Sequence, residues 1–317
     1  MKNIRYRAIT ATVLVYALVV LGGVVRITGS GMGCGDDWPL CNGRLFPPLD
    51  DLATVIEYGH RQLAALITVL IAATALMTFR HRSTPGVKVR GGGGLGRPAA
   101  LVVVLLVVQI LLGAVTVWLE LPAWSVVLHL SAALALLATL VVLTLRAGTT
   151  PNPTPQGTSR GLAHGTVALT GLTALTLLLG ALTANLDAGG ACLGFPLCSG
   201  QIWPSGGIAG LARVHWIHRL LAYGLFLLTL VLAARARGAP APVRRTLWAC
   251  LGLVTAQLGV AVVMIMLGLP QIWRVLHVAV GTALWVAVVY AVWLTGGRAN
   301  LRQTIDSRQG PGALWGT

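Results

Sequence analysis

Eight long apolar runs dominate the chain, and short polar segments separate them. We place the runs at about residues 8–27, 55–79, 99–118, 125–145, 161–184, 211–233, 247–267 and 273–295. Most of them reach the roughly 20 residues that an α-helix needs to cross the hydrocarbon core of a bilayer. A helix satisfies its own backbone hydrogen bonds, which an open strand in lipid cannot do. The pattern therefore predicts an all-α integral membrane protein with eight transmembrane helices.

The composition agrees with this class of protein. Of the 317 residues, 56% are apolar and 10% are charged, whereas about 25% is usual for the charged fraction of a soluble domain. A net charge of +15 in a soluble protein would indicate a nucleic-acid partner. Here the basic residues lie between the apolar runs, so we interpret them as topology signals and expect membrane lipid, and no nucleic acid, around the chain.

The distribution of lysine and arginine predicts the orientation of the helices. Of the 23 basic residues, 17 lie in the N-terminal segment, in the loops after the second, fourth and sixth runs, and in the C-terminal tail. Loops rich in basic residues stay in the cytoplasm, so we expect both termini there. Seven of the eight acidic residues lie on or near the opposite, outer side. The first run has a basic start like a signal peptide but no small-residue cleavage site, so we keep it as the first helix.

The chain also contains an internal repeat. The segment DWPLCNG at 37–43 recurs as GFPLCSG at 194–200, and the pair His60-Arg61 recurs as His218-Arg219. Gln109 and His129 recur as Gln257 and His277. We therefore predict two tandem four-helix bundles, residues 1–150 and 151–317, related by pseudo-twofold symmetry. Because each half has an even number of helices, the axis is expected along the membrane normal.

Four of the seven histidines belong to this repeat, as the pairs His60 with His129 and His218 with His277. At 1.5 Å rise per residue, both members of the first pair lie roughly 7 Å below the outer helix ends. Histidine inside a membrane is costly and indicates function. Facing imidazoles with no carboxylate or thiolate at the same level suit a haem iron better than a zinc or di-iron site. Hydrogen bonding between helices is the alternative.

Charged residues next to these histidines are further candidates. Arg61 and Arg219 are expected to pair with haem propionates, or alternatively to extend to lipid headgroups. Glu57 lies three residues before His60 and therefore on the same helix face, as a candidate base or stabiliser of positive charge. The alternative is an acid favoured by the helix dipole. His215 takes the place of Glu57 in the second half, which makes the first half the candidate reaction site and the second the candidate electron-carrying site.

Four of the five cysteines form two close pairs, Cys34 with Cys41 and Cys192 with Cys198, in matching outer loops. The outer compartment is oxidising, so each pair can be a disulfide rather than a metal site. Such a bond is either a structural clip or a thiol–disulfide couple that passes electrons. Cys250 lies inside the seventh run and is expected to be a packing residue.

Three motifs together resemble the haem A synthase family in its bacterial form with cysteine pairs. They are GGVVRITGSGMGC at 22–34, DWPLC at 37–41 and EYGHR at 57–61. The resemblance covers nearly all of the chain. It implies an oxidoreductase of the bacterial cell membrane that oxidises the C8 methyl of haem O to a formyl group by successive hydroxylations. The product, haem A, serves terminal oxidases.

The resemblance also implies residue roles. His60 and His129 would hold the substrate haem, haem O or its product haem A, and Glu57 matches the family's important acid. His218 and His277 would hold a haem b cofactor. Since two histidine ligands leave an iron no open position, we expect one ligand in the first half to leave during turnover.

The cysteine pairs and partners follow from the same resemblance. The pair Cys34–Cys41 matches the family's outer pair, whereas a pair matching Cys192–Cys198 occurs in only part of the family. The expected protein partners are haem O synthase (a farnesyltransferase) and terminal oxidase subunits. A homo-oligomer is also compatible with the sequence.

Two other functions remain compatible with the residues. A di-haem b-type membrane electron-transfer protein would hold two haems b and make no haem A. A quinone-linked thiol oxidase would need Cys34 and Cys41 but not His60. A transporter is disfavoured because Pro122 and Pro270 fall at helix ends rather than at the membrane midplane.

Overall fold

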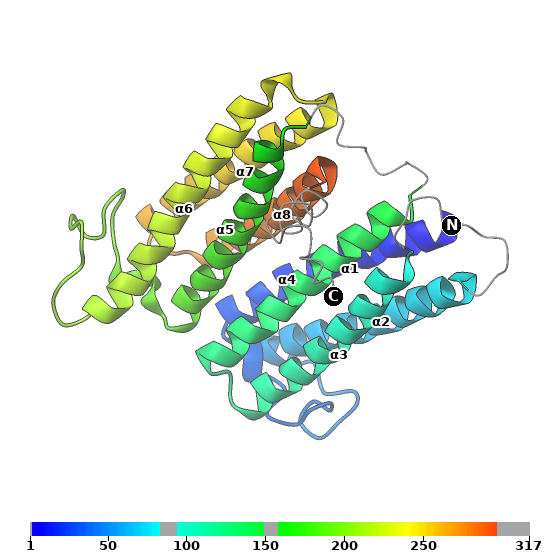
Figure 1. The fold of residues 1–317 in the computed structure, drawn as a ribbon. Helices are drawn as coiled ribbons and strands as arrows, with labels where there is room; N and C mark the ends of the chain where they lie inside the picture. Colours follow the sequence, from blue (N-terminus) through cyan, green and yellow to red (C-terminus); the bar gives the residue numbers. More distant parts are fainter. Residues whose placement is uncertain (1, 83–93, 149–157, 297–317) are drawn as a thin grey trace, which may run out of the picture.

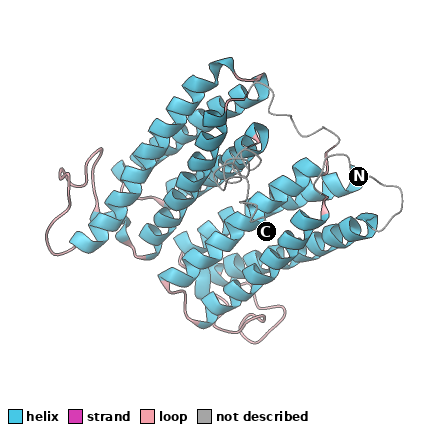
Figure 2. Ribbon diagram, viewed as in Figure 1, coloured by secondary structure: helices cyan, strands magenta, loops and turns pink. Residues whose placement is uncertain are grey.

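The computed structural model describes residues 2–82, 94–148 and 158–296, and this part of the chain is helical without β-strands (Figures 1 and 2). The long helices are α1 Lys2–Ile27, α2 Leu52–Arg82, α3 Gly96–Trp118, α4 Ala123–Arg146, α5 Arg160–Asn185, α6 Ala209–Arg235, α7 Ala241–Met266 and α8 Gln271–Thr295. Short 3₁₀ turns lie at Ser30–Met32, Ala188–Ala191 and Ala236–Gly238. In the described ranges, eight helices are long and apolar enough to cross a membrane. The prediction of a multi-pass, all-α membrane protein is confirmed.

Several helices extend beyond the apolar runs at the end that carries the N-terminus. The first begins at Lys2 instead of residue 8, the second ends at Arg82 instead of 79, and the seventh begins at Ala241 instead of 247. These extra turns contain basic and small residues. Their hydropathy excludes them from a transmembrane run, but their backbone continues the same hydrogen-bond ladder.

At the opposite end, which we call the disulfide end, a side-chain cap and two prolines determine where helices begin. Asp51 caps α2, because its Oδ2 accepts the backbone N–H of Thr54 at 2.8 Å. This hydrogen bond holds the pKa of the Asp51 carboxyl below its usual value. Pro122 and Pro270 stand in extended backbone immediately before α4 and α8. Both prolines therefore start helices rather than interrupt them.

Helices α1 to α4 pack against one another, and so do α5 to α8 (Figure 1). The two groups meet where α1 and α4 contact α8 and where α4 contacts α5. Hydrogen bonds reinforce this junction: the Trp285 indole N–H donates to the Leu134 carbonyl at 2.9 Å, and the Tyr16 hydroxyl donates to the Ala279 carbonyl at 3.0 Å. The twofold relation between the groups, and their division at residue 150, stay predictions.

Candidate functional site

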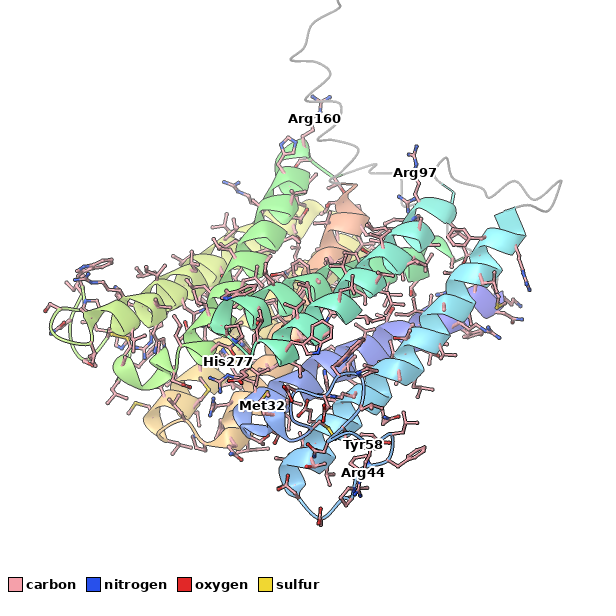
Figure 3. All side chains as sticks on the ribbon, turned by 90° about the horizontal axis from the view of Figure 1, so that it is seen from below. Met32, Arg44, Tyr58, Arg97, Arg160 and His277 are labelled. Carbon is pink, nitrogen blue, oxygen red and sulfur yellow. A yellow bond between two sulfur atoms is a disulfide. The ribbon has the colours of Figure 1, made fainter. Side chains whose placement is uncertain are left out.

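The four repeated histidines lie on α2, α4, α6 and α8, in the part of each helix nearer the disulfide end. Figure 3 shows His277 among the helices, with Tyr58 and Arg44 at the disulfide end and Arg97 and Arg160 at the other. In the second half the rings face each other: the centroids of His218 and His277 are 6.4 Å apart, at an interplanar angle of 75°. The spatial pairing expected there from the sequence is thus present in the structure.

One hydrogen bond sets the tautomer of His218. Its Nδ1 lies 3.1 Å from the Thr176 carbonyl oxygen, which can only accept a hydrogen bond. The proton is therefore on Nδ1, and Nε2 carries the lone pair that a metal needs. Histidine ligands usually have such a partner, because it fixes the ring and makes the other nitrogen more basic.

Glycines on the preceding helices allow the histidine rings to lie where they do. A Cβ on Gly180 of α5 would be 2.8 Å from Cε1 of His218, and one on Gly22 of α1 would be 3.4 Å from Cε1 of His60. A Cβ on Gly113 of α3 would be 3.1 Å from Cε1 of His129. Sequence reasoning missed these glycines. The signal was present for two of them, because Gly22 and Gly180 are separated by the same 158 positions as their histidines.

The two repeated glutamines contact their histidines differently. Gln109 Nε2 lies 3.0 Å from the ring Nε2 of His129, whereas Gln257 Nε2 donates to the backbone carbonyl of His277 at 3.0 Å. The His277 Nδ1 is buried and has no hydrogen-bond partner in the described part of the chain. Among the described residues, the α8 imidazole of the second half therefore makes no side-chain hydrogen bond, whereas the first half engages the ring on α4.

A cavity of about 350 Å³ opens onto the second histidine pair. Its lining includes His215, His218, Arg219, Arg274 and His277, together with apolar side chains from both halves of the chain. The volume falls in the range of about 300–1,000 Å³ that is typical of ligand and cofactor sites. The site thus combines an apolar chamber with a small number of polar groups near one end.

In the first half, Glu57 and Arg61 fasten the disulfide loop to α2. Glu57 is 3% exposed, and its Oε2 accepts the backbone N–H of Cys34 at 2.8 Å. Its Oε1 accepts the Nε–H of Arg61 at 3.1 Å. Arg61 also donates to the backbone carbonyls of Asp37 and Leu40. These contacts bind the carboxylate and the guanidinium to each other and to the loop.

The second half repeats this arrangement with a different acceptor. Arg219 donates from Nη1 to the carbonyl of Gly194 at 2.8 Å, and from Nη2 to the carbonyl of Cys192. Its Nε–H donates to Nε2 of His215 at 3.2 Å, where the first half has Glu57. The substitution noticed in the repeat is therefore a change of hydrogen-bond acceptor for the same arginine.

Both arginines consequently hold loops, which the sequence did not reveal. An arginine has five N–H donors, and hydrogen bonds to backbone carbonyls and to Glu57 or His215 occupy most of them in Arg61 and Arg219. Pairing with haem propionates stays a prediction for both. The location of Glu57 beside a bound haem likewise stays a prediction.

Both cysteine pairs in the loops of the disulfide end are disulfide-bonded, Cys34 to Cys41 and Cys192 to Cys198. Each closes a loop with the same turn, because Cys41 exchanges backbone hydrogen bonds with Arg44 as Cys198 does with Gln201. The free Cys250 is buried in the core, as expected for a packing residue.

Eight long apolar helices in the described part of the chain, with partly buried histidines beneath two disulfide-closed loops, define a polytopic membrane protein. The chain belongs to the COX15-CtaA family of cytochrome oxidase assembly proteins, whose family model matches residues 5–289.

Proteins similar to the chain over most of its length carry the name Heme A synthase. One from Alkalihalophilus pseudofirmus is 31% identical over 73% of this chain and 75% of its own length. Another from Symbiobacterium thermophilum is 30% identical over 93% of this chain and 96% of its own length. A third, from an Exiguobacterium species, is 33% identical over 69% of both chains. The resemblance noted from the three sequence motifs is confirmed.

Proposed function

We propose that this protein is a haem A synthase, an oxidoreductase that converts the C8 methyl of haem O into the formyl group of haem A. The observation that carries the proposal is the facing pair His218–His277 at a cavity of about 350 Å³, in a chain whose relatives carry that name. A di-haem electron carrier would share the histidines, so the product distinguishes the two functions.

The residues present fit a haem in the second half. His218 has its Nδ1 proton directed to Thr176 and its Nε2 free, and His277 has a buried Nδ1 with no partner in the described ranges. No group of three or more histidine, cysteine or carboxylate side chains in these ranges is placed to hold a metal ion by itself. Two imidazoles therefore suit an iron that receives its remaining ligands from a macrocycle.

The proposed division of labour assigns haem b to His218 and His277 and the substrate to His60 and His129. When bound, haem b supplies one-electron redox chemistry, and the protein contributes position and electrostatics. Glu57 supplies a negative charge one helical turn from His60, on the same face of α2. The acid is held in place by Arg61 and by the Cys34 N–H, so it cannot rotate away from that level.

The distribution of basic residues supports one orientation of the helices in the membrane. In the proposed orientation both termini lie in the cytoplasm, and the disulfide end faces the outside of the bacterial cell membrane. Haem O is then received from the enzyme that makes it, a farnesyltransferase, and haem A is passed to terminal oxidase subunits. The disulfides act as clips in this proposal, because each closes a loop that an arginine fastens to a helix.

The decisive experiment expresses the full chain in cells that supply haem O, extracts the haems and identifies them by mass. The intact protein is expected to yield haem A, and His60→Ala is expected to yield none because the substrate ligand is missing. Glu57→His gives Arg61 an imidazole acceptor, as His215 does for Arg219 in the second half. The arginine is therefore expected to keep holding the loop, while the negative charge of Glu57 is lost. Haem A is expected to be absent from this variant as well.

His164→Ala serves as the matched control. His164 lies 16 residues before Gly180 on α5, which is about 24 Å along the helix at 1.5 Å per residue. It is expected to leave haem A formation unchanged. Recovery of haem b alone from the intact protein, with haem O supplied, would favour the di-haem electron carrier instead.

A further inference from the structure

Arg274 is a cationic side chain at the cavity that neither the repeat nor the loop contacts explain. It lies on α8, three residues before His277, and lines the cavity in a half-buried position. In the described part of the chain no hydrogen bond or ion pair engages its guanidinium. Asp187 also lines the cavity and is close enough to act on Arg274 electrostatically. Its Oδ1 accepts from Arg26 at 3.0 Å, and its side chain is 82% exposed, so Arg26 and solvent reduce its repulsion of an anion in the cavity.

His215 supplies a second donor to the same cavity. Its Nε2 accepts the Nε–H of Arg219, and arginine is always protonated, so the imidazole proton is on Nδ1. That Nδ1 is buried, in a residue that is 5% exposed, and makes no well-aligned hydrogen bond among the described residues, although the backbone of Ala188 and Gly189 lies close to the ring. A buried donor without an acceptor is costly. An anionic ligand in the cavity would remove that cost.

Both donors have the same relation to the candidate iron ligands. His215 precedes His218 by three residues, and Arg274 precedes His277 by three. Three residues bring a side chain back to the same helix face, about 4.5 Å nearer the disulfide end. We propose that Arg274 and His215 bind the carboxylate groups of the haem held between His218 and His277. This inference rests on the proposed function and adds to it the residues that anchor the haem.

The first half carries no such anchor at the corresponding positions. Glu57 stands in place of His215 and Val126 in place of Arg274. The carboxylate of Glu57 would repel an anion, and its acceptor atoms are already bonded to Cys34 and Arg61. Arg274 and His215 therefore retain one haem as a resident cofactor in the second half. The haem in the first half lacks this anchor, so it can enter as substrate and leave as product.

The test measures how fast haem b leaves the purified full-length protein for an excess of apomyoglobin. Arg274→Gln is expected to accelerate the loss about tenfold or more, since hydrogen bonds with a charged partner are the strong ones. Arg274→Lys keeps the charge, so its rate of haem b loss is expected to lie between those of the wild type and Arg274→Gln. Arg213→Gln removes an equal charge from α6, where Arg213 contacts Trp203 and the Pro204 carbonyl, and is expected to leave the rate unchanged.

A second measurement addresses the carboxylates directly and needs no variant. Haem-depleted wild-type protein is reconstituted with haem b or with its dimethyl ester, whose carboxylates carry no charge. From the wild type, the ester is expected to leave about tenfold faster than haem b. The ester itself is expected to leave wild type and Arg274→Gln at the same rate. Arg274→Gln is also expected to lower the haem reduction potential, because it removes a positive charge that favours the reduced iron.

Equal rates of loss for haem b and its ester from the wild type would overturn the inference. Equal rates of haem b loss from wild type and Arg274→Gln would do so too. If Arg274→Gln does not accumulate in the membrane, the ester comparison alone decides. A wild-type protein that holds no haem b would instead refute the proposed function, so the two failures are distinguishable.

Discussion

Replacing Gly180 by alanine tests whether close helix approach positions His218, the proposed haem ligand. The added Cβ would lie 2.8 Å from Cε1, 3.3 Å from Nδ1 and 3.4 Å from Nε2 of that imidazole. Carbon atoms in contact prefer a separation of about 3.5–4.0 Å. The ring must therefore move by roughly 1 Å, which displaces the nitrogen that would bind iron and stretches the 3.1 Å hydrogen bond to Thr176.

The size of the effect follows from related perturbations. Disturbing the partner that orients a metal ligand typically lowers metal affinity about 10- to 100-fold. We expect Gly180→Ala to lower haem b affinity within that range. The assay is the haem b content of purified protein and the rate of haem transfer to apomyoglobin, measured beside thermal unfolding in detergent.

Other glycines provide a graded series and a control. Gly113→Ala places its Cβ 3.1 Å from His129, and Gly22→Ala places one 3.4 Å from His60, so the effect on the first-half haem should decrease in that order. Gly171→Ala on α5 meets open space. It is expected to keep haem b and to gain up to about 1 kcal/mol of helix stability. Haem b retention by Gly180→Ala equal to that of Gly171→Ala would refute the reasoning.

Three further predictions concern stability. Glu57→Gln leaves the partly buried guanidinium of its arginine partner without a countercharge, and unfolding in detergent should become easier by about 1–3 kcal/mol; an unchanged melting temperature would contradict the loop-fastening role. Asp51 has a lowered pKa, so its capping contribution is present above its ordinary value of 3.8 and is lost as pH falls further. The melting temperatures of wild type and Asp51→Asn should therefore differ at pH 6 and converge at lower pH. Trp285→Phe removes the indole hydrogen bond to Leu134 between the halves and should cost about 0.5–1.5 kcal/mol, with stability equal to the wild type as the contrary result.

The repeat in the sequence was sufficient to find the histidines but not their surroundings. Because His60 and His218 recur at a fixed offset, comparison of the halves singled them out in a chain with seven histidines. Their contacts with Gly22 and Gly180 depend on how closely α1 approaches α2 and α5 approaches α6. A sequence records a small residue at such positions, but the distance between two helix axes is a property of their packing.

Arg61 and Arg219 show the same limit. Their location next to a histidine predicted haem contact, yet their donors bond to loop carbonyls that lie more than 20 residues away along the chain. Arg274 is the converse case. No sequence pattern singled it out, and only the structure shows that it lines the cavity.

The sequence by itself determined the membrane class, the eight helices, the disulfide pairs and the family. These features depend on local hydropathy, on spacing and on residue identity, all of which a linear chain carries. Only the tertiary structure decided which polar groups are already bonded and which face the cavity. The reason is physical: a hydrogen-bond donor can be used once, and the packing of loops on helices determines where it is used.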